Sequence, residues 1–235
     1  MKLGLTSVTF RKLDWRKIIQ IALDCGLDGI EWGGDIHVPP GDPEHARMVY
    51  QATAGAGLEV LSYGSYYRLG EGQDFGPVLT TALALQANAI RVWAGGANTS
   101  LVRATEDARR VADMAKPHGV TVAFEYHRGT LTETAERTLA LLDAVGRDNV
   151  KTYWQPNPER SHRRNLAELT AVLTHLENVH VFHWSRHGIR LPLEDGAREW
   201  RAYLQAAKPR AAILEFVKND DPAQLARDAE TLRRL

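Results

Sequence analysis

Short β-prone runs alternate with amphipathic stretches along the whole chain. After the first run, Ile18 and Ala22 share one helical face, between Asp14 as a predicted N-cap and Gly26 as a predicted end. The same pattern then recurs to the end of the chain. The runs that predict strands cover 2–10, 28–32, 58–63, 89–93, 120–125, 150–154, 178–184 and 211–216. The stretches that predict helices cover 14–26, 43–56, 75–86, 101–116, 130–146, 166–176 and 197–207, with a last one beginning at 221.

This alternation repeats with a period of about thirty residues, the spacing of a strand-helix unit. Strand-then-helix repeats force parallel pairing, and eight such units close naturally into a (β/α)8 TIM barrel. A doubly wound open sheet is the alternative, but no Gly-x-Gly-x-x-Gly or Walker loop follows the first strand. No Pro/Gly/Ser-rich linker divides the chain. We therefore expect one TIM-barrel domain over 1–235, with α/β class and parallel strands.

The composition limits the kinds of molecule that the protein is expected to bind. The chain has 235 residues, 44% of them hydrophobic and 25% charged, which suits a globular protein with a sizeable core. Lys plus Arg and Asp plus Glu both number 29, so the formal net charge is zero. Nucleic acid and anionic membranes both bind most tightly to proteins with an excess of Lys and Arg, so neither is expected as the main partner. The sequence is compatible with a homo-oligomer.

Two further features bear on the compartment. Cys25 is the single cysteine, so no internal disulfide can form and a reducing compartment is expected. Arg11 and Lys12 interrupt the region where a signal peptide would need its apolar run, and no stretch approaches the roughly 20 apolar residues of a membrane span. We expect a cytoplasmic protein.

Polar side chains follow the predicted strands at their carboxyl ends, where TIM barrels place their chemistry. The fifth to eighth strands contribute Glu125, Gln155, His180 and Glu215. Two carboxylates, one imidazole and one amide oxygen suit a single divalent cation such as Mn²⁺, Co²⁺, Zn²⁺ or Mg²⁺. A structural alternative is that Glu125 or Glu215 forms a salt bridge with Arg91 or Arg128, and that His180 is a core histidine.

Several motifs along the chain resemble the xylose-isomerase-like family of TIM barrels, a group of sugar phosphate isomerases and epimerases. The resemblance covers essentially the whole chain. It is carried by GIEWGGDIHVPPGD at 29–42, FEYHRGTLT at 124–132, HVFHWSR at 180–186 and LEFVK at 214–218.

The resemblance to ketose epimerases of that family implies specific roles. It assigns one metal ion to Glu125, Gln155, His180 and Glu215, and an acid/base pair to Glu125 and Glu215. It also assigns a substrate contact to Arg186. Gln155 stands where these epimerases carry Asp, and an amide oxygen brings no charge. Where they carry a substrate-binding His, this chain has Pro158.

Other candidates for substrate contacts come from residue type and position. His37 lies on a loop rich in Gly and Pro, and Trp93 ends the fourth predicted strand, where it is as well suited to packing as to stacking on a sugar. Arg128 follows Glu125 closely and is a candidate for a substrate oxygen. Lys218 follows Glu215 and either neutralises a substrate oxygen or phosphate or is solvated.

These residues predict an enzyme that moves a proton between adjacent carbons of a small polyhydroxy carbonyl compound. A chelated carbonyl acidifies the neighbouring C–H, and a glutamate removes the proton. We expect a sugar or sugar phosphate isomerase or epimerase. The alternatives are a metal-dependent dehydratase of a keto-sugar or cyclitol and a catalytically silent sugar-binding barrel, which the uncharged Gln155 favours.

Overall fold

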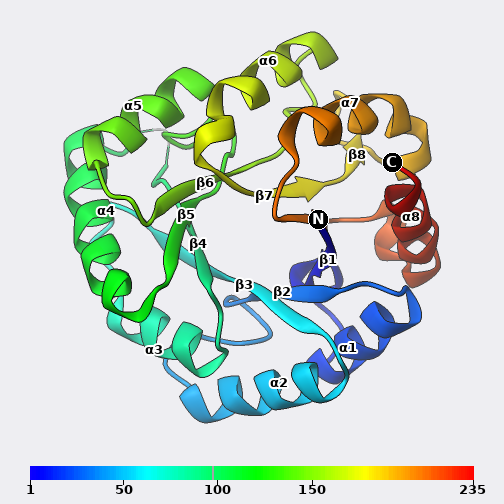
Figure 1. The fold of residues 1–235 in the computed structure, drawn as a ribbon, viewed down its shortest axis with the longest axis horizontal. Helices are drawn as coiled ribbons and strands as arrows, with labels where there is room; N and C mark the ends of the chain where they lie inside the picture. Colours follow the sequence, from blue (N-terminus) through cyan, green and yellow to red (C-terminus); the bar gives the residue numbers. More distant parts are fainter. Residues whose placement is uncertain (97) are drawn as a thin grey trace.

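The computed structural model describes residues 1–96 and 98–235, in which eight parallel strands close into a barrel ringed by helices (Figure 1). Each strand pairs in parallel with its neighbour, and the last strand returns to pair with the first. The barrel strands are β1 (Lys2–Thr6), β2 (Gly29–Gly33), β3 (Glu59–Arg68), β4 (Ala89–Trp93), β5 (Thr121–Phe124), β6 (Val150–Trp154), β7 (Leu176–Val181) and β10 (Ala211–Leu214). The predicted (β/α)8 barrel is confirmed.

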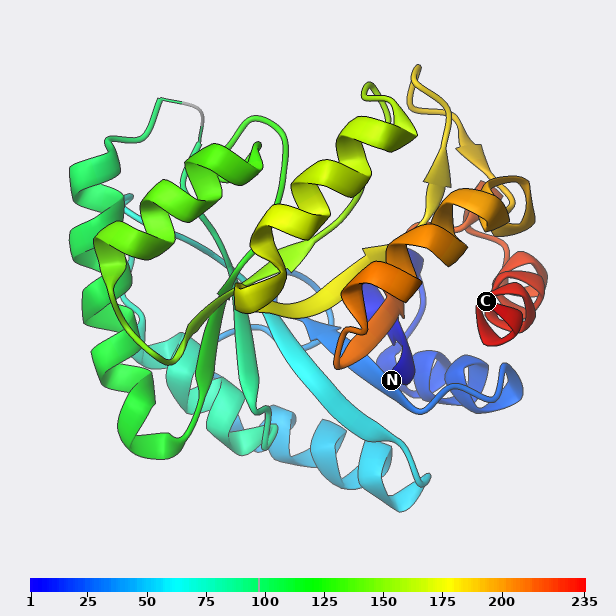
Figure 2. The ribbon, with the colours of Figure 1, turned by 45° about the horizontal axis from the view of Figure 1, so that its top comes forward.

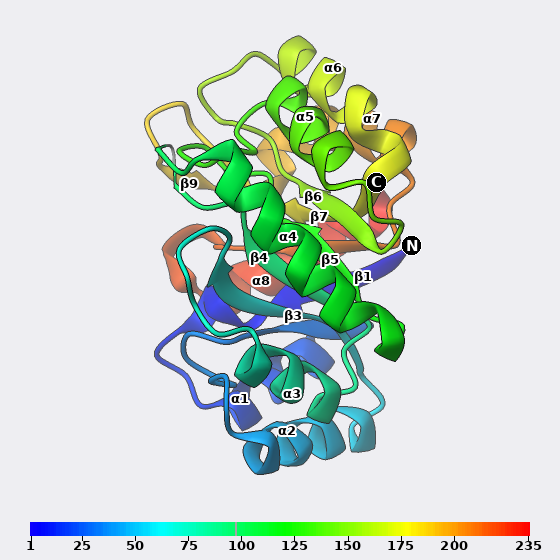
Figure 3. The ribbon, with the colours of Figure 1, turned by 90° about the vertical axis from the view of Figure 1, so that its left-hand side faces the viewer.

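The helices pack their apolar faces onto the outside of the barrel, and Figure 3 shows α3, α4 and α5 along one side of it. Several begin behind a side chain that accepts a backbone N–H and so satisfies a free donor of the first turn, as Asp14 does for α1 and Asp221 for α8. The helices are α1 (Trp15–Asp24), α2 (Pro43–Gly55), α3 (Gly76–Ala84), α4 (Leu101–Ala115), α5 (Ala135–Val145), α6 (His162–Val172), α7 (Ala197–Ala207) and α8 (Pro222–Arg234).

Three predicted strands end at least two residues earlier than expected. β1 stops at Thr6, and Ser7–Phe10 forms a 3-10 turn in which the Ser7 hydroxyl accepts the backbone N–H of Gly33 at 2.9 Å. The eighth strand stops at Leu214 rather than at 216. The seventh stops at Val181. Beyond it, β8 (His183–Trp184) leaves the barrel and pairs antiparallel with β9 (Arg190–Leu191). This hairpin projects from the barrel at the upper right of Figure 2.

Two predicted helices also differ from the structure. The helix expected over 166–176 ends at Val172, and Leu176 already belongs to β7. The helix expected from 130 begins at Ala135. Its delay has a local cause, because the hydroxyls of Thr130 and Thr132 donate to backbone carbonyls of the preceding loop, at His127 and Glu125. Those bonds hold a turn in place of a first helical turn.

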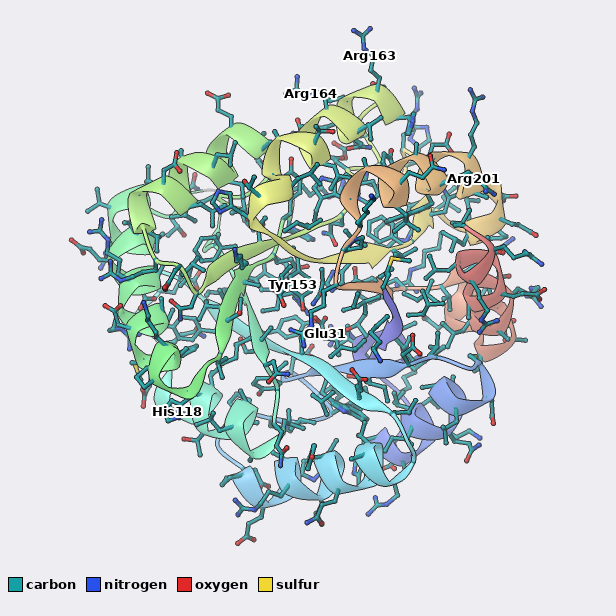
Figure 4. The ribbon with its side chains drawn as sticks, in the orientation of Figure 1. Glu31, His118, Tyr153, Arg163, Arg164 and Arg201 are labelled. Atoms are coloured by element: carbon teal, nitrogen blue, oxygen red, sulfur yellow. The ribbon has the colours of Figure 1, made fainter. Side chains whose placement is uncertain are left out.

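The barrel interior contains a small apolar cluster formed by Leu61, Ala123, Tyr153, Ala211 and Ile213. Figure 4 shows Tyr153 and Glu31 at the centre of the ring of strands, whereas Arg163 and Arg201 project outward. The Tyr153 ring meets the His180 ring edge-on, with 5.1 Å between centroids. The cluster therefore supports polar side chains directly. Among the described residues, no helix is long and apolar enough to cross a membrane.

Candidate functional site

A network of buried ion pairs adjoins this apolar cluster. Arg91 on β4 donates from Nε to Glu31 Oε1 at 3.1 Å and from a terminal nitrogen to Glu125, which directly follows β5. The Ser62 hydroxyl donates to the other oxygen of Glu31 at 2.8 Å. Gly64 leaves the space for Arg91, because a Cβ there would lie 2.5 Å from Arg91 Nη2. Burial alone would raise the pKa of Glu31, but Arg91 and His180 outweigh it and hold that pKa below its ordinary value.

His180 on β7 is fully buried, and Glu31 sets its orientation. Its Nε2 lies 3.1 Å from Glu31 Oε1, and its Nδ1 lies 3.5 Å from Glu215 Oε2 and 3.3 Å from Gln155 Oε1. Burial lowers the pKa of His180, but Glu215 and Glu31 together raise it above the ordinary value. A carboxylate that accepts one ring N–H leaves the other nitrogen free to act as a ligand. Glu31 therefore presents Nδ1 towards Glu215.

Three of the four predicted metal ligands come together. Glu125, His180 and Glu215 each offer one ligand atom, and these atoms lie within 4.8 Å of one another. All three residues are buried. Burial is also the main cause that raises the pKa of Glu215. Gln155 joins this group through its contact with His180, which places its amide oxygen at the edge of the cluster.

The net charge of the cluster favours binding of a cation. Glu31, Glu125 and Glu215 are three carboxylates, and Arg91 is the guanidinium that pairs with two of them. As a metal ligand His180 would be neutral, and three carboxylates with one guanidinium would then leave two negative charges in a buried site, which is costly without a counter-ion. A divalent cation would balance them. The donor set of carboxylate oxygens and one imidazole therefore fits one such ion.

A cavity of about 230 Å³ opens onto this group. Glu125 and Glu215 line it, and Gln155 lines it as well. Aromatic side chains form most of its remaining walls. On one side Trp93 lies between Tyr66 and His127, with ring centroids 6.3 and 4.6 Å away. The other wall residues of this type are Tyr126, Phe182, Trp184 and Phe216.

The predicted substrate contacts divide into two sets. Trp93 and Arg128 both line the cavity, and Arg128 also forms an ion pair of 2.6 Å with Glu159. His37 is buried away from it, with its ring nitrogens 2.9 Å from the Ser7 hydroxyl and 3.0 Å from the Leu13 carbonyl. Those hydrogen bonds give His37 a structural role.

Arg186 and Lys218 do not line the cavity in the described part of the chain. Arg186 is exposed in the turn between β8 and β9, where its Nε donates to the neighbouring His187 ring. Lys218 begins a 3-10 turn after β10. The early end of β7 explains the position of Arg186, because the chain leaves the barrel before reaching it.

Glu31 was not assigned a role from the sequence, and Arg91 was considered only as a salt-bridge partner of Glu125 or Glu215, a contact that the structure contains with Glu125. Both lie on predicted strands, and a charged residue inside such an apolar run was the available signal. Tyr66 was less accessible to sequence reasoning. It has a φ of +59°, and Phe216, beside Glu215, has a φ of +51°. Bulky residues rarely adopt this region, so only tertiary contacts could have revealed these two wall positions.

Comparisons with known proteins agree with this architecture. Residues 19–235 match the model of the family described as xylose isomerase-like TIM barrel. A 3-dehydroshikimate dehydratase of Bacillus anthracis is 28% identical over 168 residues, which is 64% of this chain. The match spans 60% of that protein's length.

Solved structures with the same fold cover nearly the whole chain. A probable 3-DHS dehydratase from Bacillus anthracis has a TM-score of 0.82 at 20% identity, covering 99% of both chains. The 3-keto-D-glucoside 4-epimerase of E. coli has a TM-score of 0.78 at 16% identity, covering 100% of both. The IolI protein with a bound zinc atom has a TM-score of 0.75 at 15% identity, covering 100% of this chain and 96% of that one. At these identities the likeness shows the fold.

Proposed function

Because the chain belongs to the xylose isomerase-like TIM barrel family, we propose that it is a metal-dependent enzyme acting on a small polyhydroxylated carbonyl compound. The proposed step removes a proton from the carbon beside the carbonyl. The observation that carries the proposal is the buried group of Glu125, His180 and Glu215, two of which line the aromatic cavity. Buried carboxylates facing a cavity are the side chains that such a step needs.

Glu125, His180 and Glu215 would hold one divalent cation, with Gln155 beside them. The cation would supply a Lewis acid that polarises the substrate carbonyl and stabilises negative charge on its oxygen. The zinc atom bound to the IolI protein, which shares this fold, supports a metal in the proposal.

The glutamates of the chain carry the proton in this proposal. Glu215 and Glu125 approach the cavity from different strands, β10 and β5, so they can act on two sides of a bound substrate. Arg91 pairs with Glu125 and fixes its position. If the proton returns to the neighbouring carbon or the opposite face, the enzyme is an isomerase or epimerase. The epimerase of E. coli with the same fold supports this outcome.

A dehydratase is the second candidate. It uses the same proton removal, followed by loss of a hydroxyl group as water instead of return of the proton. The relative from Bacillus anthracis, a 3-dehydroshikimate dehydratase, specifically favours it. The aromatic walls also suit the flat ring that such a reaction forms.

One set of experiments tests the proposal and separates the two outcomes. Elemental analysis of purified protein should find about one divalent cation per chain. D-Fructose and 3-dehydroshikimate are then incubated with the enzyme in D₂O. Deuterium in a product of unchanged formula identifies an isomerase or epimerase, and a product lacking one water identifies a dehydratase.

Glutamine variants locate the base in that assay. Glu125→Gln and Glu215→Gln keep the side-chain size but remove the base, so turnover should fall by about 10²–10⁴. Glu133→Gln is the matched control, since Glu133 lines the same cavity but pairs with Arg137. Parent rates in both test variants would place the base on another residue. A protein that binds no metal on titration and turns over neither compound would leave a silent sugar-binding barrel as the explanation.

A further inference from the structure

A second cavity lies beside the first, and the proposed reaction makes no use of it. Its volume is about 160 Å³. The two cavities share a wall formed by Pro156, Asn157, Pro158, Phe182 and Trp184. The remaining lining comes from Arg160, from the start of α6, from β8 and from α7, and Figure 1 shows α6, α7 and β8 on the same side of the barrel.

Two residues that line this second cavity carry a nitrogen without a partner. Within the described residues, His162 Nδ1 and Trp184 Nε1 are buried without a hydrogen bond. His183 and Glu199 add an imidazole and a carboxylate to the same lining. Trp184 also lines the first cavity, so in the described part of the chain His162 is the residue with an unpartnered nitrogen that lines the second cavity but not the first. Buried polar groups normally have a partner, so His162 together with His183 and Glu199 suits a hydrogen-bonding occupant.

Aromatic rings form the rest of this cavity, and their positions are fixed. Trp200 donates its Nε1–H to the Phe182 carbonyl at 2.8 Å and meets Tyr203 at 90°. The His183 ring packs against Gly196, where an added Cβ would lie 2.3 Å from His183 Nδ1. The site is therefore already arranged before any ligand arrives, which lowers the entropic cost of binding.

The chemistry of the lining favours a sugar over a metal ion. Among the described residues, the side chains of this cavity do not bring three ligand atoms together as Glu125, His180 and Glu215 do. Instead, aromatic faces can cover the C–H side of a ring, while imidazole, indole and carboxylate groups bond its hydroxyls.

We infer that the second cavity binds a second sugar unit, so that the substrate is a glycosylated carbonyl sugar. This inference rests on the proposed function, because the reacting unit lies in the first cavity beside Glu125 and Glu215. The attached unit then lies on the other side of the shared wall, which includes Pro158 and Trp184.

Calorimetric titration of the metal-loaded protein tests the inference. The probes are D-fructose and three of its glucosides or galactosides, namely turanose, isomaltulose and lactulose, which differ in linkage. At least one disaccharide should bind about tenfold or more tightly than D-fructose, because new hydrogen bonds form in the second cavity. Glu199→Gln and His162→Leu should each remove most of that gain. Glu194→Gln is the matched control, since Glu194 is exposed and lies outside the cavity.

Two outcomes would overturn the inference. One is that no disaccharide binds more tightly than D-fructose, absence of binding included. The other is that the gain persists in both test variants. Metal content of the same preparations reports on the proposed function separately, so a metal-loaded protein without the gain contradicts only the second sugar site.

Discussion

At the scale of single residues, Glu31 controls the candidate metal group without touching the cavity. It accepts from His180 Nε2 and from Arg91, and so fixes both the imidazole and the guanidinium. Outer partners of this kind orient a ligand and raise its basicity. The side chain that was not assigned a role from the sequence therefore determines how His180 presents its other nitrogen.

Glu31→Gln is expected to lower metal affinity by about 10–100-fold, because the amide is a weaker acceptor for the His180 ring N–H. Competitive titration with a metal indicator measures the change. Glu168→Gln serves as the control, since Glu168 is also a buried glutamate but bonds to Tyr126 instead. Unchanged affinity in Glu31→Gln would show that His180 does not bind the metal through the arrangement described.

Gln155→Asp tests the amide at the edge of the same group. Gln155 Oε1 lies 3.3 Å from His180 Nδ1 but carries no charge. A carboxylate there adds direct attraction to the cation, so metal affinity should rise tenfold or more, on the order of 1.4 kcal/mol. Turnover need not follow, since a more negative group weakens the Lewis acid. Equal or weaker metal binding in this variant would place Gln155 on the substrate instead.

At the scale of elements, the loop after β5 is tied to α6. The Tyr126 hydroxyl donates to the buried carboxylate of Glu168, which also pairs with Arg160 and Arg164. Tyr126 lines the first cavity directly after Glu125. The contact between Tyr126 and Glu168 on α6 therefore holds one wall of the first cavity in place.

Glu168→Ala should lower the free energy of unfolding by about 2–3 kcal/mol, because it leaves the buried Tyr126 hydroxyl without its acceptor. Urea denaturation measures the loss. Glu230→Ala is the control, since it removes an exposed i,i+4 pair with Arg234 and should cost about 0.5 kcal/mol or less. Equal effects of the two changes would mean that the tie between the loop and α6 adds no stability.

At the scale of the whole molecule, the metal group joins strands far apart in the sequence. Its candidate ligands come from β7 and from the ends of β5 and β10. An ion that binds only when these strands are assembled must stabilise the barrel as a unit. Metal binding at this group would therefore be coupled to folding.

Mn²⁺ at about 100 times its Kd should stabilise the chelator-treated protein by about 2.7 kcal/mol, which raises Tm by about 5–10 °C. Scanning calorimetry with and without the ion gives the shift. The same addition to His180→Ala should produce little or no shift, whatever the Tm of that variant. A parent Tm that does not respond to any divalent cation would argue against the site.

The sequence by itself determined the barrel and the residues at its carboxyl end. Periodic burial reflects local geometry, so strand and helix patterns are readable without knowing their partners. Parallel strands in a barrel end on one face, which is why Glu125, His180 and Glu215 could be expected to meet.

Only the tertiary structure decided which side chains of different strands bond to one another and where each strand ends. The Glu31 bond to His180 spans 149 positions of sequence, so no local pattern encodes it. The exit of the chain after Val181 and the buried contacts of His37 kept Arg186 and His37 away from the cavity. Such outcomes depend on packing between segments far apart in the sequence. The free energy of that packing can override local conformational preference, and no local sequence pattern reveals it.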